Sequence, residues 1–180
     1  MDTEEKTEVR NGYGTNMSFR QEAFKSGQLF RTSLGVKGRE QKGWQEPGAE
    51  ETDFSIRVKR KTGKRIIYNP LIKVEHKVFR YRLRASFIAK RAYWEGYAKA
   101  MLNQWYRPTE SEATVLSTEY ELLRRILFGL LPRIMKGIFN QPLIAMRQLM
   151  AMVTILSCVA GGYLSYRISS VFGRSRAYGV

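Results

Sequence analysis

The chain has 180 residues, and its 31 Lys and Arg against 16 Asp and Glu give a formal net charge of +15 at pH 7. Its single cysteine, Cys158, excludes a disulfide within the chain. The positive charge suits nucleic acid or an anionic membrane, but the chain has no zinc, helix-turn-helix or RNA-binding signature, so we predict membrane lipid as the partner and no nucleic acid.

The N-terminal part of the chain carries a glycine-rich stretch and an acidic helix start. Residues 12–20 read Gly-Tyr-Gly-Thr-Asn-Met-Ser-Phe-Arg, and three carboxylates occur within residues 50–53, just after Pro47 and Gly48. Pro and Gly break regular structure, and acidic side chains stabilise a first helical turn through the helix dipole. We therefore predict a helix that begins near residue 50 and ends at Gly63. Taken alone, these acidic residues indicate a capped helix on the protein surface.

The neighbouring stretches suggest more than a surface helix. Residues 63–70 read Gly-Lys-Arg-Ile-Ile-Tyr-Asn-Pro, and residues 74–78 read Val-Glu-His-Lys-Val. In this order and at these intervals, the four stretches resemble the C-terminal half of the catalytic domain of family-2 glycosyltransferases, which have the GT-A fold. The resemblance covers roughly residues 10–105. Within the family it is most similar to archaeal enzymes that glycosylate dolichyl-phosphate-linked sugars.

The family patterns imply structure for each stretch. The first pattern, G-x-N-M-S-F-R-R-E, is a strand and turn, and the second, G-E-D-T-E-x-x-x-R, begins a helix. The patterns G-x-x-I-x-Y-x-P and V-x-H are strands, matched here by residues 63–70 and 74–78. A later family pattern, R-A-x-x-x-G-x-x-K-A, matches residues 91–100. The implied fold class is a partial α/β domain, the C-terminal half of a GT-A-like domain, followed by amphipathic helices and a C-terminal transmembrane helix.

The resemblance also implies roles for individual residues. Glu51 corresponds to the family's general base, which takes the proton of the acceptor hydroxyl while the nucleotide leaves. The family usually has Asp there, so this carboxylate lies about one methylene further from the backbone. Glu50 is the flanking acid of the catalytic pair, suited to orienting the loop. Asn16, Arg20 and Asp53 fall on substrate-side positions of the patterns, and Asp53 also suits a structural capping role.

His76 is the chain's only histidine. A lone histidine at a strand end is ordinarily packed against the sheet or solvated, whereas in related GT-A enzymes a histidine after the second strand can complete a divalent metal site. The resemblance thus implies a Mn²⁺ or Mg²⁺ ion that screens the leaving diphosphate as a Lewis acid. The chain has no Asp-x-Asp motif and no glycine-rich phosphate loop. We expect the remaining ligands and the nucleotide-binding half to be missing from it, so that the chain alone is inactive.

Helical periodicity continues in the middle of the chain. Within residues 82–105, apolar side chains recur at helical spacing while Lys90, Arg91 and Lys99 face elsewhere. Such a helix either lies on a bilayer surface, where it brings a lipid-linked acceptor to the catalytic part, or simply packs within the protein. Residues 126–139 are apolar but interrupted by Pro and basic residues, which favours an interfacial helix over a second crossing.

The C-terminal third contains a predicted membrane span. Between Arg147 and Arg167 lie 19 uncharged residues, close to the roughly 20 that cross a bilayer. Small residues at 157 and 160–162 form a surface that can pack another helix. The charge changes along the chain: up to Ile56 there are 8 basic and 10 acidic residues, and from Arg57 onward 23 and 6. Basic clusters beside a span suit anionic head groups.

These observations predict four segments: a GT-A-like half domain over residues 1–80, interfacial helices and a linker over 81–140, a transmembrane helix over 141–168 and a basic tail over 169–180. The predicted protein is an integral membrane glycosyltransferase with a cytoplasmic catalytic part. It transfers a sugar from a nucleotide- or lipid-activated donor to a polyprenyl- or dolichyl-linked acceptor. The alternative is a catalytically dead, truncated membrane protein that acts as a scaffold or remnant. Basic residues lie on both sides of the span, so topology stays open.

Overall fold

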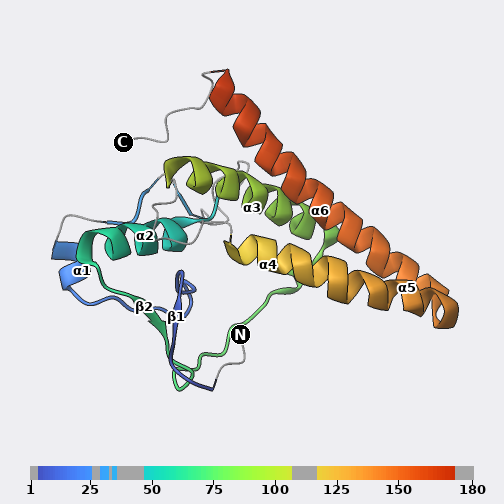
Figure 1. The fold of residues 1–180 in the computed structure, drawn as a ribbon, viewed down its shortest axis with the longest axis horizontal. Helices are drawn as coiled ribbons and strands as arrows, with labels where there is room; N and C mark the ends of the chain where they lie inside the picture. Colours follow the sequence, from blue (N-terminus) through green and yellow to red (C-terminus); the bar gives the residue numbers. More distant parts are fainter. Residues whose placement is uncertain (1–3, 26–28, 33, 36–46, 107–116, 173–180) are drawn as a thin grey trace. The chain divides into compact units, whose positions relative to one another are not determined.

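The computed structural model describes residues 4–25, 29–32, 34–35, 47–106 and 117–172. The chain forms two compact units, residues 1–80 and residues 81–178. Figure 1 shows that helices dominate the described part, with one small sheet in the first unit. Most of the predicted linker, residues 107–116, and residues 173–180 of the tail predicted over 169–180 lie outside the described residues.

The first unit contains two helices and a two-stranded sheet. α1 spans Glu22–Lys25 and α2 spans Glu50–Thr62. β1, Thr7–Val9, pairs antiparallel with β2, Ile66–Tyr68. The predicted helix start is confirmed, and so is its end, because Gly63 caps α2 in the left-handed conformation with φ 65°. The strand expected within residues 63–70 is confirmed as β2.

Aromatic side chains form the core of this unit. Phe54, on α2, is fully buried. Its ring stacks on Phe30 and Phe24 with centroid separations of 4.3 and 5.3 Å, and Phe19 meets it edge-on at 4.8 Å. Such ring arrangements add to the stabilisation that an aromatic core gains from burying apolar area. Val58, one turn further along α2, extends this core. The segment after the glycine turn is thereby fixed against the acidic helix.

Three expectations about this unit need correction. The strand implied for residues 12–20 does not form: these residues contain a turn closed by an isolated bridge between Tyr13 and Asn16. Residues 74–78 do not form the expected strand: they lie in an exposed segment without regular secondary structure. A strand needs a hydrogen-bonding partner, and the described residues offer this segment none. The α/β prediction holds only in part, since the described chain is mostly helical with one two-stranded sheet. A GT-A-like fold is not established by these elements.

The second unit is helical. The helix predicted over residues 82–105 is confirmed as α3, Ala85–Trp105, which follows a short 3₁₀ turn at Arg80–Leu83. The remaining helices, in chain order, are α4, Ser117–Arg125; a π-helical segment, Ile126–Leu130; α5, Leu131–Asn140; and α6, Pro142–Val171. Residues 126–139 are therefore helical as predicted. The apolar run of residues 148–166 lies within α6.

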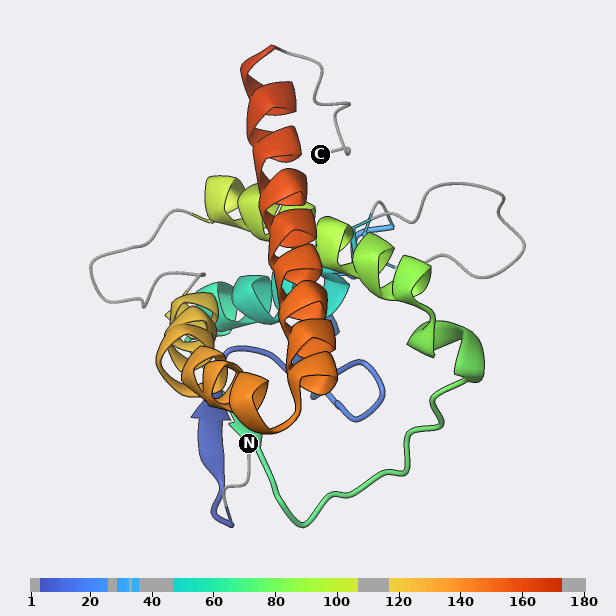
Figure 2. The ribbon, with the colours of Figure 1, turned by 90° about the vertical axis from the view of Figure 1, so that its right-hand side faces the viewer.

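Helices α3 and α6 cross in close contact (Figures 1 and 2). A Cβ built on Gly96 of α3 would collide with the backbone carbonyl of Val159, and one on Gly162 of α6 would collide with that of Tyr93. Near this crossing the Tyr93 hydroxyl donates a hydrogen bond to Ser165 Oγ at 2.8 Å. Small residues permit such close backbone approach between helices. The predicted small-residue surface of α6 thus contacts α3 through Gly162.

The crossing predicts a position-specific effect of adding one methyl group. Gly162→Ala should destabilise the chain in detergent by about 1–3 kcal/mol, because the new Cβ meets backbone atoms that cannot rotate away. Thermal unfolding followed by circular dichroism measures this loss. Gly161→Ala is the matched control: no atom lies within 4 Å of its added Cβ, and Ala favours helix over Gly. Equal unfolding temperatures for the two variants would contradict the crossing.

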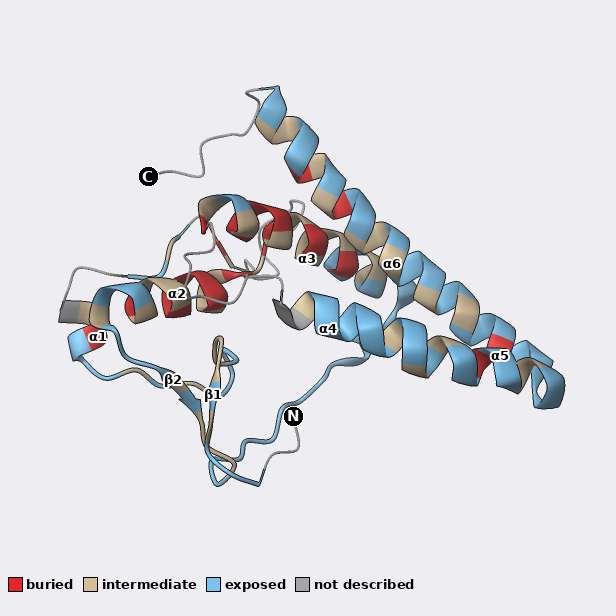
Figure 3. Ribbon diagram, viewed as in Figure 1, coloured by how far each residue is buried: buried red, intermediate tan, exposed pale blue. Residues whose placement is uncertain are grey.

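α6 is long and apolar enough to cross a membrane. In its most apolar stretch of 18 residues, 6% of the residues are buried within the structure. Figure 3 shows exposed and half-buried residues along most of its length. A core helix of a soluble protein would instead be mostly buried. The exposure of α6 therefore favours contact with lipid, as the composition predicted.

Candidate active site

The carboxylate of Glu51 lies against the glycine turn. Glu51 is in the first turn of α2 and is half-buried. A Cβ built on Gly14 would collide with its Oε1 atom. Two of the stretches that carry the family resemblance therefore meet at this carboxylate. Glycine at position 14 leaves the space that the Glu51 side chain occupies.

Hydrogen bonds fix the turn that approaches Glu51. The backbone N–H of Asn16 donates to the Tyr13 carbonyl at 2.8 Å. The Asn16 side chain donates from Nδ2 to the carbonyl of Ile72 at 3.1 Å. Asn16, predicted to contact substrate, thus lies close in the chain to Gly14 and tethers the turn to the segment after β2. Its side chain is exposed, and the amide oxygen stays available for a polar ligand.

Glu50 and Glu51 contact different parts of the first unit. Glu50 approaches Gly35: a Cβ built there would lie 3.4 Å from the Glu50 Cδ and Oε1 atoms. The backbone N–H of Gly35 donates to the Pro47 carbonyl at 3.2 Å, which joins this loop to the residues just before α2. Consecutive helical residues point in directions about 100° apart. The flanking acid therefore faces a loop, as an orienting group would, while Glu51 faces the turn.

Asp53 is fully buried and bound to two guanidinium groups. Arg57 donates to Asp53 Oδ2 from Nε at 2.9 Å and from Nη2 at 2.7 Å. Arg31 Nε lies 3.3 Å from Asp53 Oδ1. Arg57 also donates to the carbonyl of Leu29 at 2.7 Å. This cluster ties residues 29–31 to α2, which is a structural arrangement for a side chain predicted to face substrate.

An exposed ion pair joins the sheet to α2. Lys59 Nζ lies 2.6 Å from Glu8 Oε1 on β1. The hydrogen bond that Lys59 donates holds the pKa of Glu8 below its usual value. Because the folded-state pKa is lowered, any stabilisation from this pair is present near neutral pH and is lost as the pH falls through the folded-state pKa of Glu8. Exposed pairs of this kind contribute little to stability.

The remaining predicted site residues are exposed, and no hydrogen bond or ion pair joins them to Glu51 within the described residues. Arg20 and His76 are both exposed, and His76 lies in the segment without regular structure. Within the described residues, no group of three or more His, Cys, Asp or Glu comes together as a metal site. A single imidazole does not make a Mn²⁺ or Mg²⁺ site, which needs several oxygen ligands. The described residues therefore do not fit the metal by themselves.

The two arginines of the Asp53 cluster were not singled out from the sequence. Arg57 stands four residues after Asp53, a spacing at which acid and base face each other on a helix, so this partner was available from the sequence alone. Arg31 comes from a loop without a local signal, and only the fold places it beside Asp53.

Sequence comparison shows that this chain is similar to a glycosyltransferase, the class of protein that the motifs predict. The relative is the glucosyl-dolichyl phosphate glucuronosyltransferase of Haloferax volcanii, 29% identical over 158 residues, which cover 87% of this chain and 47% of the relative. The chain thus spans about half the length of this protein. No family model matches the chain, and no solved structure matches it significantly.

Proposed function

We propose that this chain is the acceptor-side part of a membrane-anchored glycosyltransferase with a GT-A-like catalytic domain. The proposal rests on the close approach of the Glu51 carboxylate oxygen Oε1 to Gly14. This contact supports Glu51 as the base, because its carboxylate lies at the start of α2 beside a turn whose backbone is held by its own hydrogen bonds. A half-buried carboxylate at a fixed turn suits proton abstraction from a bound hydroxyl.

The proposed reaction inverts the configuration at the anomeric carbon of the transferred sugar. The Glu51 carboxylate accepts the proton of the acceptor hydroxyl while the acceptor oxygen forms a bond to the anomeric carbon and the donor's bond to phosphate breaks. Glu50 positions the loop that contains Gly35. A divalent cation, when bound, would screen the leaving diphosphate. His76 is proposed as one ligand, with the others supplied by the part of the enzyme that this chain does not span.

The relative's name supports the proposed substrate class. That protein is named as a glucuronosyltransferase for glucosyl-dolichyl phosphate, so we propose a sugar bound to a dolichyl phosphate as the acceptor here. A nucleotide-activated glucuronic acid is the corresponding donor. α6, as a membrane anchor, would hold the catalytic unit next to a lipid-linked acceptor. The catalytic unit is proposed to face the cytoplasm.

A transfer assay on washed membranes tests this proposal. Membranes from cells expressing this chain joined to the nucleotide-binding half that we expect it to lack should retain the protein through an alkaline carbonate wash, because α6 is embedded in lipid. Given nucleotide-activated, radiolabelled glucuronic acid and glucosyl-dolichyl phosphate, the washed membranes should transfer label to the lipid-extractable fraction. Membranes from cells lacking the gene are the control. Retention without any transfer of label would favour the scaffold alternative.

A further inference from the structure

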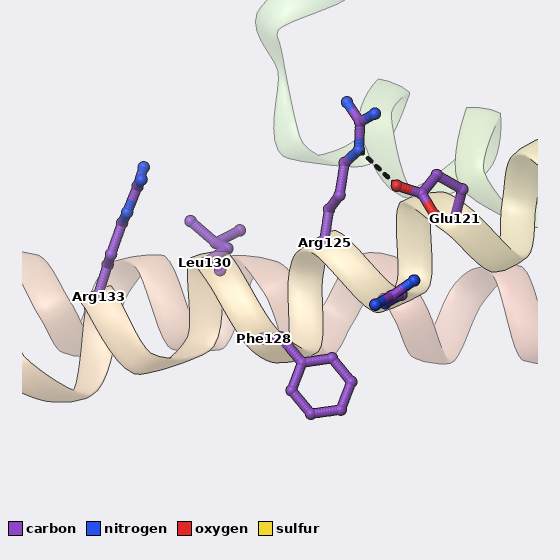
Figure 4. Close-up of a pocket in the computed structure, with 7 residues that line it drawn as sticks. Glu121, Arg125, Phe128, Leu130 and Arg133 are labelled. Atoms are coloured by element: carbon purple, nitrogen blue, oxygen red, sulfur yellow. Dashed lines mark hydrogen bonds and ion pairs between the residues drawn. The ribbon is translucent and has the colours of Figure 1, made fainter.

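An open hollow of about 470 Å³ lies along the helix formed by α4, the π-helical segment and α5. Arginines line it on both sides of the π-helical segment: Arg124 and Arg125 before it, and Arg133 after it. Figure 4 shows Arg125 and Arg133 extending from the same side of the helix, with Leu130 between them. The hollow therefore combines cationic ends with an apolar middle.

The π-helical segment opens this hollow. A π turn contains more residues than an α turn, so it bulges within a helix, and such bulges frequently occur at functional sites. Gly129 lies within this segment and lines the hollow, and no atom lies within 4 Å of a Cβ built on it. A side chain of any size at this position would project into open space. The absence of one leaves room for a ligand.

The charge of the hollow suits an anion. Arg125 donates from Nε to Glu121 Oε1 at 3.1 Å. Arg124 and Arg133 make no hydrogen bond or ion pair within the described part of the chain. Three arginines and one glutamate give a formal excess of two positive charges on this short stretch of helix. Guanidinium groups bind phosphate through paired hydrogen bonds, which makes arginine a preferred phosphate ligand.

The helix that lines the hollow leads into the candidate membrane span. Gln141 alone separates α5 from α6, and the two helices pack against each other. Ile134 of α5 is buried, whereas the first half of α6 exposes an apolar stripe at helical spacing: Leu143, Met146, Met150 and Val153. A lipid whose head group lies near α5 can therefore lay its hydrocarbon chain along α6.

We propose that this hollow binds the phosphate group of a membrane lipid. Arg124, Arg125 and Arg133 contact the phosphate, Leu130 contacts the first carbons of the lipid, and the lipid chain follows the stripe on α6. The inference requires that α6 lies in a membrane, but it does not require that the protein transfers a sugar. Its failure is therefore distinguishable from failure of the proposed function.

Native mass spectrometry of the full chain in detergent tests the site with phosphatidylglycerol and phosphatidylcholine as probes. The chain should bind phosphatidylglycerol more tightly, because its phosphate is not neutralised by a choline. The triple variant Arg124→Gln, Arg125→Gln, Arg133→Gln should weaken this binding roughly 100-fold, since each surface cation contributes about fivefold. The matched control, Lys64→Gln, Arg65→Gln, Lys73→Gln, removes the same charge from the first unit and should leave the affinity nearly unchanged.

Gly129→Leu separates a formed site from general attraction between charges. It fills the hollow, leaves the net charge unchanged and favours helix over the glycine that it replaces, so it should weaken phosphatidylglycerol binding severalfold in a folded protein. Wild-type affinity in Gly129→Leu would overturn the proposal. Equal losses of phosphatidylglycerol affinity in the two triple variants would also overturn the proposal, because they would show that binding depends on the net charge of the chain and not on this hollow. Displacement of the lipid by an equal concentration of inorganic phosphate would overturn the assignment to a lipid.

Discussion

In the membrane-bound protein restored with its nucleotide-binding half, Glu51→Gln should lower the turnover by about 10²–10⁴-fold, the usual contribution of a general base. The amide keeps the shape of the side chain beside Gly14 but cannot accept the acceptor's proton. Because the donor contacts other groups, its affinity should stay nearly constant. The measurements are the initial rate of label transfer at saturating donor and donor binding by calorimetry on the same preparation.

Glu50→Gln is the matched control for Glu51→Gln. It makes the same chemical change one residue earlier, where the carboxyl group faces Gly35 rather than the turn. It should cost less turnover than Glu51→Gln, because an orienting group affects geometry and not proton transfer. Near-normal turnover in Glu51→Gln, together with a large loss in Glu50→Gln, would assign the base to Glu50 instead.

Local signals carried most of the fold prediction. α2 begins after a Pro-Gly break with acids in its first turn and ends at a glycine, and each of these signals acts within a few residues. α6 was predicted from an uninterrupted apolar run, which length alone identifies. The strand expected over residues 74–78 depended instead on pairing with another segment. Such pairing is a property of the whole fold, so the local sequence gave a wrong result there.

In the candidate site, too, some features can be predicted from local sequence and others depend on tertiary structure. Glu51 was assigned from its motif, and its place at the start of α2 followed from helix rules. The contact with Gly14 joins residues far apart in the chain, and no local rule predicts it. Likewise, helical spacing makes Arg57 a natural partner for Asp53, but only tertiary structure brings Arg31 to the same carboxylate. Spacing rules thus recover partners on one helix and miss those contributed by loops.

Asp53→Asn should lower the local stability of α2 by about 3 kcal/mol, the low end of the range for removing one partner of a buried ion pair. The low end applies because the side chains of Arg31 and Arg57 are 33% and 17% exposed, so water can partly solvate them when the carboxylate is lost. Loss of the carboxylate leaves two guanidinium groups without their anion and loosens residues 29–31 from the helix. Hydrogen exchange of the α2 amides, measured by mass spectrometry on the full chain, reports this loss.

Two comparisons make the Asp53→Asn result specific. The amides of α3 belong to the other unit and should keep their protection, so they serve as an internal reference. Glu8→Gln removes the exposed carboxylate bound to Lys59 on the same helix and should change α2 protection far less, because water screens that pair. If Asp53→Asn leaves α2 protection intact but raises the acceptor concentration needed for half-maximal transfer, Asp53 contacts substrate and the structural role assigned to it is wrong.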